Sequence, residues 1–144
     1  IEKIKTIGDA YMLCGGIDGA PEVGARSVVA AGLEMIEAIA EEDQGQEGPP
    51  LALRVGIHTG ELVAGVIGKR KFSYDLWGDA VNTASRLESS GEASRIQISR
   101  ATASLLGEII PLEAERHITL KGLGEFPVRF VEQPQNPPKQ AKSA

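Results

Sequence analysis

The segment 72–91, FSYDLWGDAVNTASRLESSG, carries an amide and a guanidinium at a spacing that suits the binding of an anion. Asn82 and Arg86 are four residues apart, so on a helix their side chains project side by side. A guanidinium is always charged and matches phosphate oxygens, while an amide both donates and accepts hydrogen bonds. These residues could therefore hold an anionic substrate. A plain solvated helix face is the alternative that the spacing leaves open.

A helix over the second half of this segment has signals at both ends. Asp79 is the expected N-cap, and Gly91 follows the last turn as a stop signal. Apolar residues recur at helical spacing and predict the stripe that faces the core: Ala80, Val81, Ala84 and Leu87. The polar side chains of Asn82 and Arg86 then lie on another face. The preceding residues predict a strand and a tight turn.

The composition predicts a globular domain with one core. The chain has 144 residues, of which 42% are hydrophobic and 24% charged. A net charge of −5 and only 4% aromatic residues argue against a nucleic-acid surface, which needs clustered cations with stacking rings. The single cysteine, Cys14, excludes an internal disulfide and a cysteine-based zinc site, and is interpreted as a small buried hydrophobe. No run reaches the ~20 apolar residues of a membrane span, so we expect no membrane contact by this segment.

Three stretches of the sequence carry a family resemblance. YDLWGDAVNTASRLES resembles the signature of the class III nucleotide cyclases, the adenylyl and guanylyl cyclase catalytic domain. IEKIKTIGDAYM at 1–12 and LKGLG at 120–124 match that family upstream and downstream, and agreement at three places is not expected by chance. The resemblance covers 1–132, which we interpret as the catalytic domain. The Pro-rich and polar segment 133–144 is predicted to be a disordered tail.

The resemblance implies a site for two divalent ions, Mg²⁺ or Mn²⁺, held by two aspartates. Residues 1–16 predict two strands joined at Gly8-Asp9, and Asp9 matches the aspartate that the family places in this turn. The other aspartate belongs to the family's first strand, which would lie upstream of residue 1. We therefore expect an N-terminally truncated domain that is weakly active or inactive in isolation. From the residues alone, Asp9 is interpreted as a turn former.

Lys5 and Asp75 match the two positions that contact the purine in the family. The residue before the Thr-Ile-Gly-Asp turn is typically Lys in adenylyl cyclases and Glu in guanylyl cyclases, and here it is Lys5. An ammonium suits the acceptor at adenine N1, and a carboxylate at position 75 accepts from the exocyclic amine. The pair indicates ATP. The alternatives are a solubilising lysine on an edge strand and a carboxylate that caps local amides.

The implied reaction is attack of the ribose 3′-hydroxyl of ATP on its α-phosphate, which gives 3′,5′-cyclic AMP and pyrophosphate. Arg86 would stabilise the charge at the α-phosphate, Asn82 would position the ribose, and Lys121 would contact the terminal phosphates. The family shares this site between two protomers, so a head-to-tail homodimer is expected. A reducing cysteine pattern and the need for ATP favour the cytoplasm. A membrane anchor in an absent upstream region stays open.

Two tempting motifs are rejected. His58, in the predicted strand 51–60, is interpreted as structural because the family does not use this histidine for proton transfer. Gly68-Lys69 is not a Walker-type phosphate loop, which needs Gly at position 63 and Ser or Thr at position 70, where the chain has Val63 and Arg70. The rival functions are a guanylyl cyclase, a non-catalytic cyclase-like nucleotide-binding or dimerisation module, and an unrelated ferredoxin-like binding domain.

The order of elements predicts an α+β fold. Two strands, a helix, two strands, a helix, a strand, a helix and two strands follow one another along the chain. The first helix is expected from Pro21 to about residue 43, and Ser99 is the expected N-cap of the last. With the resemblance, this order implies the ferredoxin-like sandwich of the class III cyclases, with helices on a mainly antiparallel sheet. The first strand and helices of that fold would be lacking.

Overall fold

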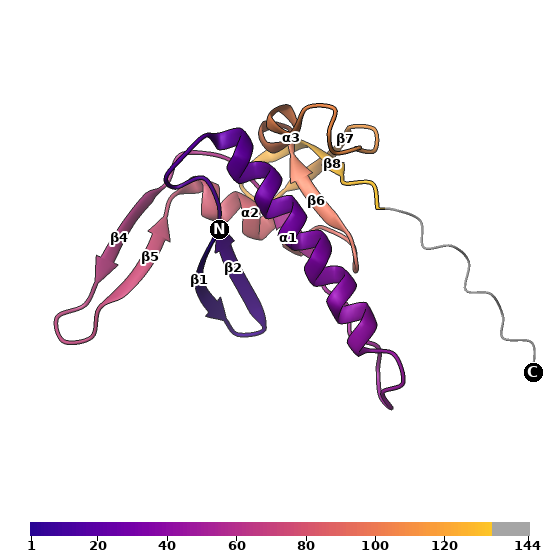
Figure 1. Ribbon diagram of the computed structural model, residues 1–144. Coiled ribbons are helices and arrows are strands. Elements are labelled where there is room, and N and C mark those ends of the chain that lie inside the picture. Colours follow the sequence, from indigo (N-terminus) through magenta and orange to yellow (C-terminus); the bar gives the residue numbers. More distant parts are fainter. Residues whose placement is uncertain (134–144) are drawn as a thin grey trace, which may run out of the picture.

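A four-stranded sheet forms the centre of the fold. The structure is a computed structural model that describes residues 1–133. The sheet has the order β3-β6-β8-β7, with bounds β3 Val55–Ile57, β6 Ile96–Ser99, β7 Arg116–Leu120 and β8 Gly124–Phe130. β3 pairs with β6 in parallel, whereas β6 with β8 and β8 with β7 are antiparallel. Figure 1 shows this sheet behind the long first helix.

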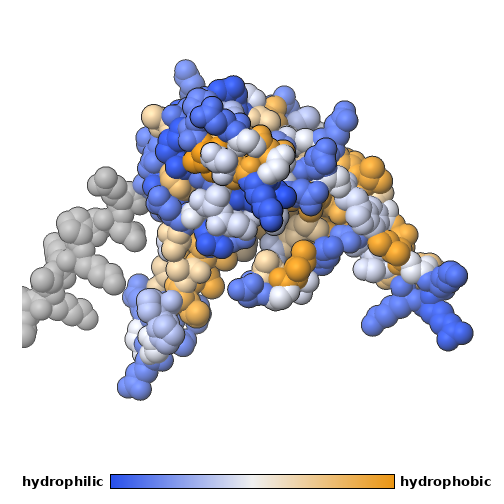
Figure 2. Space-filling model, turned by 180° about the vertical axis from the view of Figure 1, so that it is seen from behind, coloured by the Kyte–Doolittle hydropathy of each residue, from blue (hydrophilic) through white to orange (hydrophobic). Residues whose placement is uncertain are grey.

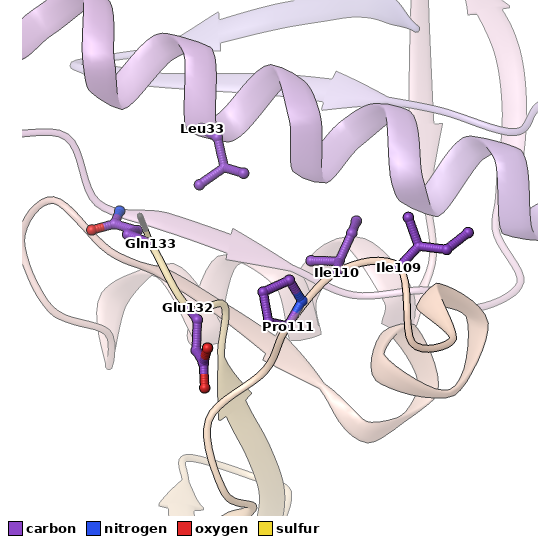
Figure 3. A pocket seen from close by; sticks show the side chains of 6 residues that line it. All are labelled: Leu33, Ile109, Ile110, Pro111, Glu132 and Gln133. Carbon is purple, nitrogen blue, oxygen red and sulfur yellow. The ribbon is translucent and has the colours of Figure 1, made fainter. Parts of the chain in front are cut away.

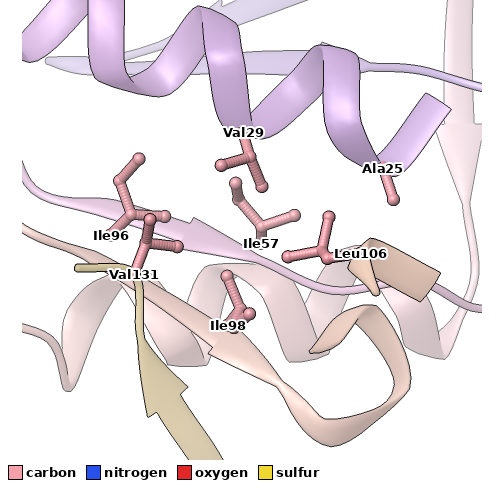
Figure 4. Packing of buried hydrophobic residues seen from close by; sticks show 7 residues of the cluster. All are labelled: Ala25, Val29, Ile57, Ile96, Ile98, Leu106 and Val131. Atoms are coloured by element: carbon pink, nitrogen blue, oxygen red, sulfur yellow. The ribbon is translucent and has the colours of Figure 1, made fainter. Parts of the chain in front are cut away.

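Three helices pack on the two faces of this sheet: α1 Pro21–Glu42, α2 Asp79–Ser89 and α3 Arg100–Leu106. Successive residues of a strand point to opposite faces. Ile96 and Ile98 of β6 therefore join a buried cluster with α1 and α3, whereas Gln97 between them contacts α2. Figure 4 shows the first cluster between α1 and the sheet: Ala25, Val29, Ile57, Ile96, Ile98, Leu106 and Val131. The second cluster holds α2 on β7 and β8: Leu87, Leu120 and Val128.

Two antiparallel hairpins stand apart from the central sheet. β1 Glu2–Ile7 pairs with β2 Ala10–Cys14, and β4 Val63–Ile67 pairs with β5 Ser73–Trp77. The β4–β5 hairpin projects as an arm in Figure 1, and Figure 2 shows it with apolar side chains along its length and a hydrophilic tip. Val66 is 63% exposed and Phe72 is 74% exposed. The arm is therefore an apolar surface without cover from the described residues.

Most element predictions are confirmed. The β1–β2 hairpin turns at Gly8-Asp9, α1 begins at Pro21, and the Ser99 side chain caps α3 by accepting a hydrogen bond from the Thr102 N–H. Three strands, rather than two, separate α1 from α2, since β5 is the strand that carries Asp75. The strand predicted over 51–60 is mostly wrong, because only 55–57 forms a ladder. Its one neighbour, β6, has only four residues between a turn and α3, and so cannot pair with a longer strand.

Gln133, the last described residue, is the first residue of the predicted tail. Gln133 is anchored by a hydrogen bond from its Nε2 to the Ser94 carbonyl at 2.6 Å. The predicted disorder of the tail otherwise concerns residues 134–144, which lie outside the described residues and for which it stays a prediction. Within residues 1–133, none of the helices combines the length and the apolar character needed to cross a bilayer.

Candidate active site

Gly78 directs the chain from β5 straight into α2. Its φ of 137° is one that only glycine adopts without strain. The helix starts at Asp79 with Gly78 in the N-cap position, and no side chain caps it. The prediction of Asp79 as N-cap is therefore wrong, since the sharp reversal requires glycine there. Asp79 instead occupies the first turn, where its carboxylate interacts favourably with the helix dipole.

Arg86, Asn82 and Lys121 line one open hollow between α2 and the end of β7. Its volume is about 470 Å³, and hydroxyl side chains complete its wall: Ser85, Ser89, Ser90 and Thr119. The Arg86 guanidinium lies against the turn after Lys121, because a Cβ added to Gly122 would sit 3.9 Å from its Nη2. Three of the predicted site residues thus come together from segments about a quarter of the chain apart in sequence.

The hollow is suited to an anion. Arg86 and Lys121 contribute two cationic groups, and none of the described residues that line it is acidic. Guanidinium, ammonium and amide donors lie on its wall, as a phosphate requires, whereas the hydroxyls of Ser89 and Ser90 donate to backbone carbonyls of α2. Thr119 and Ser90 were not predicted as site residues. Thr119 could have been found from its place two residues before Lys121, since alternate residues of a strand share a face.

Lys5 and Asp75 form an ion pair between the two hairpins. Lys5 Nζ donates to Asp75 Oδ2 at 2.8 Å, and the Leu76 N–H donates to Asp75 Oδ1 at 2.8 Å. The Lys5 side chain is 41% exposed and that of Asp75 is 15% exposed. The hydrogen bond from Lys5, followed by the one from the Leu76 amide, holds the pKa of Asp75 below its ordinary value. The structure therefore joins two predicted residues that lie seventy positions apart.

A β-bulge in β1 separates Lys5 from its neighbour Lys3. The register shifts between these residues, so that Lys3 pairs with Leu13 and Lys5 pairs with Met12. A bulge re-aims the side chains that flank it. The Lys3 ammonium lies 5.0 Å from the centre of the Tyr11 ring, whereas Lys5 reaches the other hairpin. The two lysines therefore have different surroundings despite their similar positions on one strand.

Asp9 lies apart from this group. It is exposed at the β1–β2 turn and is not among the residues that line the hollow. Among residues 1–133 there is no group of three or more His, Cys, Asp or Glu side chains that could hold a metal ion. Asp9 thus offers a single hard oxygen ligand. Cys14 adds none, since burial raises the pKa of its thiol and keeps it protonated.

His58 has a structural environment, in line with its interpretation from the sequence. Its Nδ1 is 2.8 Å from Ser99 Oγ, and its ring meets the Phe126 ring edge to face, with 6.2 Å between the ring centres. Burial lowers the pKa of this imidazole. A neutral ring that bonds to the cap of α3 connects β3 to the start of that helix.

A second hollow lies between α1 and the segment that leads into β7. Figure 3 shows Leu33, Ile109, Ile110 and Pro111 around it, with Glu132 and Gln133 on the opposite side. Its wall is mainly apolar, and none of the predicted site residues lies there. It lacks the cationic groups of the hollow beside α2, which is accordingly the candidate active site.

Comparisons with known proteins identify the family to which this fold and these motifs correspond. A family model described as the adenylate and guanylate cyclase catalytic domain matches residues 1–133. An adenylate cyclase of Mycobacterium tuberculosis is 40% identical over 124 residues, which are 86% of this chain and 28% of that protein. The soluble guanylate cyclase subunit beta-2 of Rattus norvegicus is 39% identical over 132 residues, which are 91% of this chain and 19% of that protein.

A solved structure shows the same fold. The guanylate cyclase domain of RhGC from Catenaria anguillulae, in complex with GTP, superimposes with a TM-score of 0.80 at 33% identity. The match covers 90% of this chain and 71% of that one. The predicted α+β fold of the class III cyclase type is thereby confirmed. The chain spans less than a third of the two curated relatives, and its motifs, its fold and the match over residues 1–133 show that it belongs to the adenylate and guanylate cyclase catalytic domain family.

Proposed function

We propose that this domain is an adenylyl cyclase, which converts ATP to 3′,5′-cyclic AMP and pyrophosphate. Membership of the family supports a nucleotide cyclase. The matched relatives include both an adenylate cyclase and a guanylate cyclase, so the family does not choose between ATP and GTP. The choice of ATP depends on one observation, the ion pair between Lys5 and Asp75. Both residues match the purine-contacting positions of the adenylyl type, and their contact places an ammonium and a carboxylate side by side.

This pair is complementary to adenine and mismatched to guanine. Adenine presents an acceptor at N1 beside a donor amine, so that Lys5 can donate while Asp75 accepts. Guanine presents a donor at N1 beside the O6 acceptor. In the same orientation its N1–H would face the Lys5 ammonium, and its O6 would face the Asp75 carboxylate. Each unpaired polar group costs about 1–3 kcal/mol. The lowered pKa of Asp75 supports this assignment, because only the ionised carboxylate is purely an acceptor.

The hollow beside α2 would bind the phosphates. Arg86 and Lys121 supply positive charge from two sides, and Asn82, one turn before Arg86, supplies donor and acceptor groups for the ribose. We infer that Arg86 stabilises charge as it develops at the α-phosphate, while Lys121 holds the terminal phosphates. Fixed donors aimed at developing charge commonly contribute about 10²-fold or more in rate. No side chain of the chain itself needs to transfer a proton in this scheme.

Divalent ions, Mg²⁺ or Mn²⁺, belong to the proposal only in part. When bound, they would supply activation of the 3′-hydroxyl and neutralisation of the triphosphate. Asp9 is the residue that would hold them, as a hard carboxylate ligand. The described residues contain no group of three such ligands, so Asp9 supplies only part of the coordination that a two-ion site requires.

We also propose a homodimer with shared active sites. Asp9 does not line the hollow of its own chain, and a site divided between protomers would take Asp9 from one and the remaining groups from the other. The uncovered apolar side chains of the β4–β5 arm support a partner surface. The requirement for ATP supports a cytoplasmic location.

The test is cyclic nucleotide production from ATP and from GTP, with Mg²⁺ or Mn²⁺, by this chain and by a version extended upstream. Lys5→Glu combined with Asp75→Cys should lower the use of ATP relative to GTP. Lys3→Glu is the control for Lys5→Glu, since it makes the same lysine-to-glutamate change two residues away on β1 and should leave the ATP preference unchanged.

Other outcomes would select the rival functions. Preference for GTP by the unmodified protein would replace the proposal with a guanylyl cyclase. Binding of nucleotide without turnover by both versions would favour a non-catalytic cyclase-like module, which the incomplete metal-ligand set favours for residues 1–133 taken alone.

A further inference from the structure

Gln97 is a buried polar residue whose amide is fully engaged. It lies in β6 and is 1% exposed. Its Nε2 donates to the Leu87 carbonyl at 2.9 Å and to Ser90 Oγ at 3.0 Å, while its Oε1 accepts from Arg116 Nη2 at 2.7 Å. The chemistry of the partners fixes its orientation, because a carbonyl only accepts and a guanidinium only donates. Gln97 thus links α2 on one side to β7 on the other.

The α2 end of this link closes the last helical turn. The final carbonyls of a helix have no partner within it. Here the Leu87 carbonyl receives the Gln97 amide, and the Arg86 carbonyl receives both the N–H and the Oγ of Ser90, at 3.0 and 2.7 Å. Leu87 is fully buried, so water cannot replace Gln97 at its carbonyl without opening the packed surface. The amide therefore fixes the turn that carries Arg86.

The β7 end is rigid because Arg116 is itself held. Its guanidinium carbon lies 4.2 Å from the centre of the Phe130 ring, and that of Arg95 lies 3.9 Å from the same centre. Phe130 is 3% exposed and is the strand partner of Gln97. Arg116 Nε is buried with no hydrogen-bond partner among the described residues, so the bond to Gln97 is a principal polar contact of this cation. Loss of Gln97 would leave a charge poorly compensated at a half-buried position.

Both ends of the link lead to the walls of the candidate active site. Ser90, which accepts from Gln97 and donates to the Arg86 carbonyl, lines the hollow, and β7 runs from Arg116 to the residue before Lys121. We propose that Gln97, anchored by Arg116, is a positioning residue that sets the Arg86 guanidinium against Lys121 for the phosphates. This inference rests on the proposed cyclase function. It adds a residue that touches no substrate and that the family motifs do not include.

Gln97→Met tests the proposal, since it keeps the side-chain length and removes both donor and acceptor. Misplacement of a catalytic group by about 1 Å costs up to about 10²-fold in rate, and we expect kcat for cyclic AMP formation to fall about ten-fold, with a smaller change in KM. Val29→Ala is the matched control. It removes buried atoms from the cluster between α1 and the sheet, away from the hollow, and should lower the melting temperature without lowering kcat of the folded protein.

Amide hydrogen exchange gives a second readout that needs no turnover. Gln97→Met should speed exchange at Ser90 and Gly91, whose N–H groups close the last turn of α2, and Val29→Ala should not. Should Gln97→Met fail to fold, Ser90→Ala removes the branch of the link that runs through Ser90 Oγ to the Arg86 carbonyl and leaves the bond from Gln97 to the Leu87 carbonyl. It should speed exchange at the same positions by a smaller factor, and no change would overturn the proposal.

The failures of the two proposals are distinguishable. An active protein in which Gln97→Met and Val29→Ala have the same kcat overturns the positioning role and leaves the cyclase function standing. A protein that makes no cyclic nucleotide even when extended upstream overturns the function, and with it the role of Gln97 toward the phosphates. Exchange then tests only the structural half of the inference: faster exchange supports Gln97 as the group that fixes the last turn of α2, and unchanged exchange overturns it.

Discussion

The central sheet with its helices and the two hairpins differ in what holds their residues in place. Both buried clusters consist of residues from the sheet and the helices, joined in the first cluster by Val131 after β8. The hairpins contribute Leu76 as a buried apolar side chain, and most of their large apolar residues are exposed. The sheet is therefore stabilised by burial of apolar surface, whereas the hairpins are held to each other by the ion pair between Lys5 and Asp75.

The candidate site is divided along the same line. Arg86 and Lys121 lie on elements packed through Leu87, Leu120 and Val128, as contacts to a developing charge require. Lys5 and Asp75, which would choose the base, lie on the hairpins. In the proposed cyclase, rate and substrate choice would therefore be carried by two regions that differ in how much apolar surface they bury. Substitutions in the packed region should change turnover or folding, and substitutions in the hairpins should change selectivity or assembly.

The largest expected effect is on turnover, from Arg86→Ala. Removal of the guanidinium from the hollow should lower kcat by about 10²-fold or more, with the free energy of unfolding changed by less than about 0.5 kcal/mol. Steady-state kinetics and chemical denaturation measure the two quantities. Arg54→Ala is the control, since Arg54 binds Glu88 on the exposed side of the same helix. Equal losses in both variants would contradict the role of Arg86.

Leu87→Ala should have the largest effect on folding. Leu87 is fully buried between α2 and the sheet, and truncation of such a side chain costs about 2–5 kcal/mol because a cavity remains. Urea denaturation followed by circular dichroism measures the change. A loss of less than about 1 kcal/mol in the free energy of unfolding would mean that α2 moves to fill the cavity. The sheet and the hairpins would then differ less in how tightly they are packed.

Val66→Asp in the arm should leave folding almost unchanged and weaken the dimer. Val66 is 63% exposed, so the free energy of unfolding of a monomer should change by less than about 0.5 kcal/mol. A carboxylate on an apolar surface that a second copy covers should weaken the dimer strongly, which sedimentation equilibrium measures. Val66→Thr, of similar size and uncharged, is the control. A dimer unaffected by the carboxylate would place the interface elsewhere.

Much of the fold follows from local sequence signals. Pro21 and Ser99 set the starts of α1 and α3. The apolar spacing predicts Ala80 and Leu87 on the inner face of α2, where the third buried residue is Thr83, while the predicted Val81 and Ala84 are half-buried. The hairpin at Gly8-Asp9 has the turn residues that such a reversal needs. Each of these features depends on residues within a few positions of one another, so a single sequence contains the information.

Features that depend on distant partners could not be read in this way. The short β3 is limited by the length of β6, forty residues further along the chain. Gly78 is the N-cap of α2 because the direction in which the chain leaves β5 is set by the tertiary structure and not by the neighbouring residues. In the candidate site, the family motifs supply Lys5, Asp75, Asn82, Arg86 and Lys121, whereas the geometry adds the contact between the first two. Gln97 matches none of these motifs, and its role depends on which face of β6 meets α2.

The smallest expected effect concerns the pH dependence of folding, through His58 of the packed region. Burial lowers the pKa of this imidazole from its ordinary 6.5, so below that pH the unfolded chain binds more protons than the folded one. The free energy of unfolding should therefore fall as the pH drops below 6.5, until it passes the lower pKa of the folded state. His58→Gln keeps a hydrogen-bonding group for Ser99 and cannot titrate, so its unfolding free energy should fall less over this range. Urea denaturation at pH values between 5 and 7.5 compares the two proteins. An identical slope for His58→Gln and the unmodified chain would show that this histidine is no more buried in the folded protein than in the unfolded state.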